Sequence, residues 1–152
     1  MSVRVLCLGN ELLADDALGI RVAEHIRRLR LNDVEVVDAA VSGFNLIDYI
    51  LNANRLVVVD TMMTGSVPAG TVRVFRAEDL CVTPGGSPHY IGLFEAIAAG
   101  KKLLLPVPDE VVIVTVEAAD CTTVGGPMAP AVEASIPAVL DEVRKHLSAL
   151  DA

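Results

Sequence analysis

The sequence predicts an α/β protein: a three-layer αβα sandwich around a mostly parallel five-stranded sheet, with one antiparallel edge strand. Three observations lead to this prediction. Short apolar runs alternate with segments of helical periodicity, as in parallel sheets that are covered by helices. Hydrophobic residues make up 53% of the chain without a single Trp, so the core must be aliphatic. The length of 152 residues suits one domain over 1–152.

Five segments have the pattern of strands. The first is Val3–Leu8, a short apolar run that ends at Gly9-Asn10. The clearest is RLVVVD at 55–60, which is apolar from its second residue up to its final aspartate. Segment 71–79 alternates apolar and charged residues, which is typical of an edge strand with one solvent-exposed face, so we expect the antiparallel strand there. The other two predicted strands are 34–40 and 110–118.

Helical spacing follows most of these strands. Between 17 and 31, Leu18, Val22 and Ile26 fall on one face of a helix. Pro137 should bend or interrupt the last helix, because proline cannot donate a backbone hydrogen bond. The other predicted helices cover 44–51, 89–100 and 129–149.

Composition and charge exclude several classes of function. A net charge of −8 and a pI near 4.7 argue against nucleic acid or an anionic membrane as the main partner. No apolar stretch approaches the ~20 residues of a membrane span, and no secretory signal is visible. The cysteines, Cys7, Cys81 and Cys121, are odd in number and form no C-x-x-C motif. The sequence therefore predicts a cytoplasmic protein without a disulfide framework.

Polar residues gather where the predicted strands end. Strand one is followed by Asn10, Asp15 and Asp16, and strands two and three end at Asp38 and Asp60. The loop 81–92, which carries His89, is long enough to reach the same edge. Binding sites of such sheets form at the carboxyl ends of the strands, so we expect these side chains to converge.

Two aspartates and one imidazole could bind a transition-metal ion with open positions, or could perform acid/base chemistry. In the segment SPH, Ser87 can cap a helix, Pro88 fits its first position, and His89 then lies in the first turn. The positive end of a helix favours a neutral imidazole, which is the form that a metal requires.

Simpler interpretations remain open for each residue. Asp15 could be a helix N-cap, with Asp16 adding negative charge at the positive helix end. Asp60 could cap a turn, Asp38 could bind loop amides, and His89 could be a packing residue. The two glycine-rich loops, around 81–92 and 120–130, could close over a ligand or serve as static connections.

Two other α/β proteins fit the first turn less well. A dinucleotide-binding domain needs G-x-G-x-x-G, but the turn offers only Gly9 and, much later, Gly19, and adjacent aspartates would repel phosphate. A phosphoacceptor receiver domain has an acidic pair directly at the strand end and a lysine after the last strand. Here the pair comes six residues after Gly9, and VVIVTVEAADC has no lysine.

The ordered segments LGNELLADDALGIRVAE, VVDAAVSGFNL, LVVVDTMMTG, PAGTVRVF and SPHYIGL resemble the maturation endopeptidases of nickel–iron hydrogenases. A P-x-V-E segment at Pro130–Glu133 extends the resemblance over nearly the whole chain. Two departures occur. Ala39 and Ala40 replace the two glycines that often follow the strand-two aspartate, and Cys7-Leu8-Gly9-Asn10 replaces the usual Gly-x-Gly-Asn.

The resemblance implies an endopeptidase that removes a C-terminal peptide from the nickel-loaded large-subunit precursor of a hydrogenase. It implies that Asp16, Asp60 and His89 are catalytic and contact nickel, which the precursor contributes as a recognition element. Asp15, Asp38 and Asn10 are then supporting residues. Either metal-assisted or carboxylate-assisted hydrolysis would fit, and a metal carrier that does not hydrolyse its partner is the alternative function.

Overall fold

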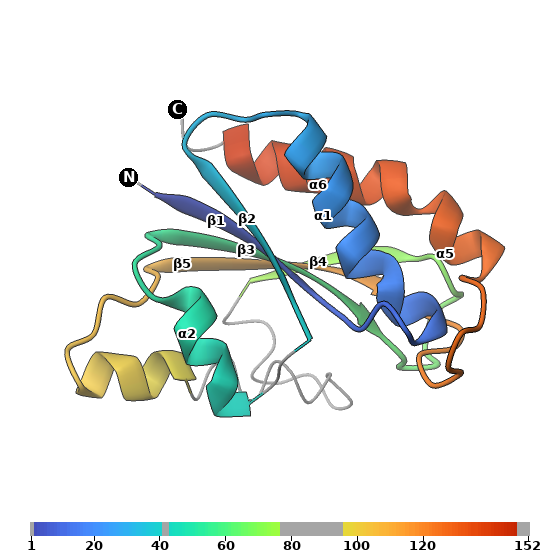
Figure 1. Cartoon of the computed structure of the whole chain (residues 1–152), viewed down its shortest axis with the longest axis horizontal. Coiled ribbons are helices and arrows are strands. Elements are labelled where there is room, and N and C mark those ends of the chain that lie inside the picture. The colour runs from blue at the N-terminus through green and yellow to red at the C-terminus, as the bar shows by residue number, and fades with distance from the viewer. Residues whose placement is uncertain (1, 41–42, 77–95, 149–152) are drawn as a thin grey trace.

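The computed structural model describes residues 2–40, 43–76 and 96–148 of the chain, and these contain the five predicted strands (Figure 1). The sheet order is β2-β1-β3-β5-β4. All neighbours are parallel except β4 and β5, which pair antiparallel. The predicted fold class is therefore confirmed. The strands are β1 (Val3–Leu8), β2 (Val34–Ala39), β3 (Arg55–Met62), β4 (Val72–Arg76) and β5 (Glu110–Glu117).

Helices cover both faces of the sheet (Figure 1). One face packs against α1 (Leu18–Arg28), α5 (Pro130–Ala134) and α6 (Ile136–Ser148), and the other against α2 (Ile47–Ile50) and a helical segment at 96–102. In β3, Val57 and Val59 belong to the first core, whereas Leu56 and Val58 belong to the second. Burial on both faces explains why this strand is apolar at successive positions.

Several helices differ from their predicted bounds. A 3₁₀ turn, η1 (Ala14–Ala17), precedes α1, and a second one, η2 (Gly43–Leu46), precedes α2. The last helix divides at Ser135, two residues before Pro137, so the predicted interruption is confirmed. Residues 77–79 of the predicted edge strand and 89–95 of the predicted third helix lie outside the described residues.

The third strand is longer than predicted. It continues past Asp60 because Thr61 and Met62 pair with Val116 and Glu117 of β5. Asp60 therefore lies within β3, near its carboxyl end, instead of ending it. Within the described parts of the chain, no helix has both the length and the apolar character that crossing a bilayer requires.

Candidate active site

The turn after β1 fixes the position of Asp16 by close backbone packing. A Cβ atom added at Gly9 would lie 2.1 Å from the carbonyl oxygen of Asp16, so only glycine fits there. Gly19 plays a similar part, since its Cβ would lie 2.4 Å from the carbonyl oxygen of Leu8. The Asn10 backbone N–H donates to Asp16 Oδ2 at 2.9 Å. The carboxylate of Asp16 is thus held against the carboxyl end of β1.

Asp16 and Asp60 come together through Thr61. The Thr61 hydroxyl donates to Asp16 Oδ1 at 3.0 Å, and the Thr61 backbone N–H donates to Asp60 Oδ1 at 2.8 Å. Asp60 is 1% exposed and Thr61 is 6% exposed, whereas Asp16 is partly exposed. Two of the three residues predicted to contact nickel therefore lie at one edge of the sheet, linked by the same threonine.

Asp15 is a buried anchor and not a helix cap. Its side chain is fully buried, and no side chain caps η1 or α1. The N-cap interpretation of Asp15 is therefore wrong. Instead, Oδ2 accepts hydrogen bonds from the backbone N–H groups of Ala119 and Asp120, both at 2.8 Å, and Oδ1 accepts one from Ala129 at 2.7 Å. Asp15 thereby ties the turn after β1 to the connection between β5 and α5.

The remaining predicted residues have other surroundings. Asp38, opposite Cys7 in the β1–β2 register, forms an ion pair with Arg27 of α1. The side chain of Asn10 accepts a hydrogen bond from the Leu12 N–H at 2.9 Å and so stabilises its own turn. His89 lies outside the described residues. The supporting role of Asp38 and the ligand role of His89 stay predictions.

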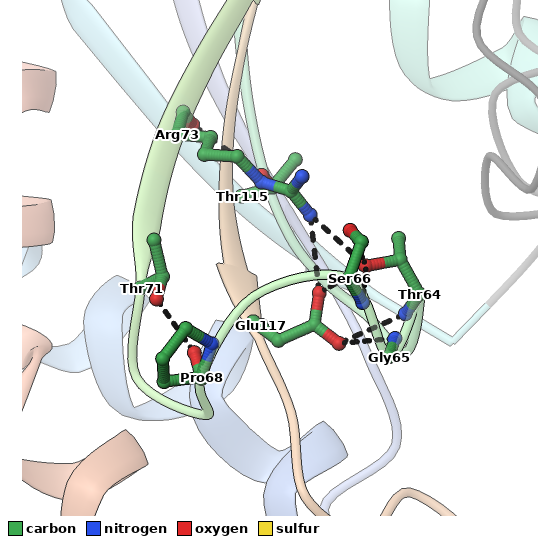
Figure 2. A network of polar contacts seen from close by, with 8 residues as sticks. All are labelled: Thr64, Gly65, Ser66, Pro68, Thr71, Arg73, Thr115 and Glu117. Atoms are coloured by element: carbon green, nitrogen blue, oxygen red, sulfur yellow. Dashed lines mark hydrogen bonds and ion pairs between the residues drawn. The ribbon is translucent and has the colours of Figure 1, made fainter.

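Glu117, which the sequence analysis did not single out, is buried at the end of β5 (Figure 2). Its carboxylate accepts hydrogen bonds from the Thr64 hydroxyl at 2.7 Å and from the backbone N–H groups of Thr64 and Gly65 at 2.9 and 3.0 Å. Arg73 of β4 forms an ion pair with it at 3.1 Å. The only sequence signal was an acidic residue at the end of an apolar strand.

The pKa of Glu117 reflects two opposing effects. Burial by itself raises the pKa, but the hydrogen bonds from Thr64 and Gly65 and the charge of Arg73 lower it below its ordinary value. The side chain is therefore ionised at neutral pH. It fixes the segment after β3 to the neighbouring strand, one position beyond the Thr61–Val116 pair in the β3–β5 register.

Cys121 lies beside the two carboxylates. Its Sγ is 3.5 Å from the Thr61 hydroxyl oxygen. Burial, chiefly, and the nearby aspartates raise the pKa of this thiol to about 11, although the hydrogen bond with Thr61 acts in the opposite direction. Burial also raises the pKa of Cys7 to about 12. Both thiols are free and protonated at neutral pH, so neither supplies a thiolate nucleophile.

Within residues 2–40, 43–76 and 96–148, no three His, Cys, Asp or Glu side chains are grouped so as to hold a metal ion. The described edge supplies two carboxylates, and the predicted third ligand, His89, is not among these residues. Paired carboxylates favour the binding of a cation, and one of them can also act as a general base. Fold and site together define an α/β protein with an acidic site at the carboxyl edge of its sheet.

Comparison with known proteins identifies the family. The family model described as hydrogenase maturation protease matches residues 20–146. The hydrogenase 2 maturation protease of Escherichia coli (strain K12) is 33% identical over 103 residues, which cover 65% of this chain and 63% of that protein. The hydrogenase expression/formation protein HupD of Bradyrhizobium diazoefficiens is 31% identical over 144 residues, covering 91% of this chain and 74% of HupD.

A solved structure agrees with these matches. The hydrogenase maturating endopeptidase HybD from E. coli superimposes with a TM-score of 0.82 at 27% identity, covering 97% of this chain and 93% of HybD. The chain therefore belongs to the hydrogenase maturation protease family. The resemblance noted from the sequence is confirmed, and with it the expectation of a maturation endopeptidase.

Proposed function

We propose that this chain removes a C-terminal peptide from the large-subunit precursor of a nickel–iron hydrogenase, and that nickel already bound to the precursor is the recognition element. Asp16, Asp60 and His89 contact the open positions of that nickel. Water then adds to the scissile carbonyl carbon and the peptide C–N bond breaks. The reaction takes place in the cytoplasm, before the large subunit is complete.

The observation that carries this proposal is the pairing of Asp16 and Asp60 through Thr61 in a chain of this family. Asp16 is partly exposed, so a cation presented by a partner can reach it. The net charge of −8 favours the approach of a cationic centre. Asp15 and Asn10 support the site, since both hold the turn that carries Asp16.

The test uses the cognate large-subunit precursor, prepared with and without nickel, and mass spectrometry of the products. We expect loss of a C-terminal fragment from the nickel-loaded form alone. Asp16→Asn and His89→Ala should lower the rate of processing at least a hundredfold without unfolding the protein. Asp48→Asn is the matched control. Asp48 is an exposed aspartate of α2, which packs on the face of the sheet opposite to α1.

Two outcomes would contradict the proposal. Cleavage of the nickel-free precursor at an equal rate would remove nickel from recognition. Absence of cleavage in either form, together with tight binding of nickel by the isolated chain, would make the protein a metal carrier that does not hydrolyse its partner.

A further inference from the structure

Thr61 occupies an unusual position between the two acidic residues. It is the residue after Asp60, and its two hydrogen-bond donors point to different carboxylates. The hydroxyl binds Asp16, which is 45 positions away in the sequence, and the backbone N–H binds Asp60. Both hydrogen bonds therefore join Thr61 to acidic side chains near the carboxyl end of β3.

Asp16 accepts a hydrogen bond at each of its two carboxylate oxygens. The single hydroxyl proton of Thr61 goes to Oδ1. The Thr61 hydroxyl oxygen also lies 3.5 Å from Cys121 Sγ. The Asn10 N–H binds the other oxygen of Asp16 at 2.9 Å. Asp16 is thus held from both sides.

We propose that Thr61 is a positioning residue, whose hydroxyl and backbone N–H hold the carboxylates of Asp16 and Asp60 in one fixed arrangement toward the substrate. This inference rests on the proposed function, in which both carboxylates contact the precursor's nickel. Ligands that are already oriented lose less entropy when they meet a metal, so loss of the hydroxyl slows processing although Thr61 does not touch the substrate.

The test compares Thr61→Val, which keeps the shape but removes the donor, with Thr61→Ser, which keeps the donor. Under single-turnover conditions with nickel-loaded precursor, we expect Thr61→Val to lower the maximal processing rate at least tenfold and Thr61→Ser less than threefold. Thr61→Ala repeats the test if the valine variant does not fold. Thr71→Val is the matched control, since the Thr71 hydroxyl donates only to the carbonyl of Pro68, as Figure 2 shows.

A second measurement does not depend on processing. In ¹H–¹⁵N spectra of the free protein, the Asn10 amide reports the position of Asp16 Oδ2. Thr61→Val should shift that resonance and speed its hydrogen exchange, whereas Thr61→Ser should leave both near their wild-type values. Unchanged Asn10 signals and an unchanged processing rate in Thr61→Val would overturn the inference. If the wild type does not cleave the precursor, the proposed function fails. An unchanged Asn10 resonance in Thr61→Val would separately refute the inference that Thr61 positions Asp16.

Discussion

The same substitution should have different effects at the adjacent residues Asp15 and Asp16. Asp15→Asn should mainly lower the stability of the protein, whereas Asp16→Asn should mainly lower its activity. Asp15→Asn keeps one carbonyl oxygen, which can still serve the amides of Ala119 and Asp120. Its new NH₂ group then faces the N–H of Ala129, which loses its acceptor at 2.7 Å. A donor thus meets a donor inside the protein, because Asp15 is fully buried.

The expected cost follows from the lost contact. A hydrogen bond to a charged group contributes about 1.5–3 kcal/mol, so we expect Asp15→Asn to lower the free energy of unfolding by about 2–3 kcal/mol. For a chain of 152 residues, the entropy of unfolding is about 0.3 kcal/mol per kelvin. The loss therefore corresponds to a fall in Tm of about 6–9 °C. In contrast, the side chain of Asp16 is partly exposed and water can replace its partners, so Asp16→Asn should cost less than about 1 kcal/mol.

Urea unfolding followed by circular dichroism measures both variants, and precursor processing measures their activity. Asp15→Asn should be the less stable protein, and Asp16→Asn should be the less active one. The reasoning would be refuted if Asp15→Asn unfolded within about 0.5 kcal/mol of the wild type. It would also be refuted if both variants lost the same stability.

Three further predictions use the same protein. Gly9→Ala should lower the free energy of unfolding by about 1–3 kcal/mol and slow processing, because its Cβ would meet the backbone of Asp16 at 2.1 Å. Glu117→Gln should destabilise the protein at pH 7, and its difference from the wild type should shrink as the pH falls below about 4.5. Cys121, tested in a Cys81→Ser background, should react with iodoacetamide about a hundredfold more slowly than an exposed thiol at pH 8, because its pKa is raised to about 11.

The sign of the Glu117 prediction follows from the direction of its pKa shift. The folded protein lowers the pKa, so the unfolded chain binds more protons at mildly acidic pH. The contribution of Glu117 is present above its unfolded pKa and is lost as the pH falls through the folded value. A constant difference between pH 7 and pH 3 would contradict this account. Likewise, normal processing by Gly9→Ala, or rapid labelling of Cys121 in the folded state, would contradict the other two.

The sequence was a good guide to the sheet, because each strand is a compact pattern of neighbouring residues. The run at 55–60 shows the limit of this information. Its apolar residues predict a buried strand, but its extension to Met62 depends on pairing with β5, more than fifty positions later in the chain. The pairing across the sheet, and not the local pattern, decides where the strand ends.

The candidate site was predictable only in part. Asp60 could be found because an acidic residue directly after an apolar run is unusual, and Asp16 because two adjacent aspartates follow the first strand before a helix. The partners of Asp15 are 104 to 114 positions away, so no local pattern separates an anchor from a helix cap. Thr61 was not predicted as a site residue, since threonine is common in strands, and the role proposed for it depends on its contact with Asp16.

The order of strands in the sheet has a consequence for biosynthesis. β5 lies between β3 and β4 although it follows both along the chain (Figure 1). While the chain emerges from the ribosome, β1, β2 and β3 can pair early, but one edge of β3 stays open until residue 117 is available. A nascent chain would therefore expose a largely apolar strand edge, which is a hazard for aggregation. Thr61 receives its neighbour on β5 only at that late stage, so the acidic site is completed near the end of folding.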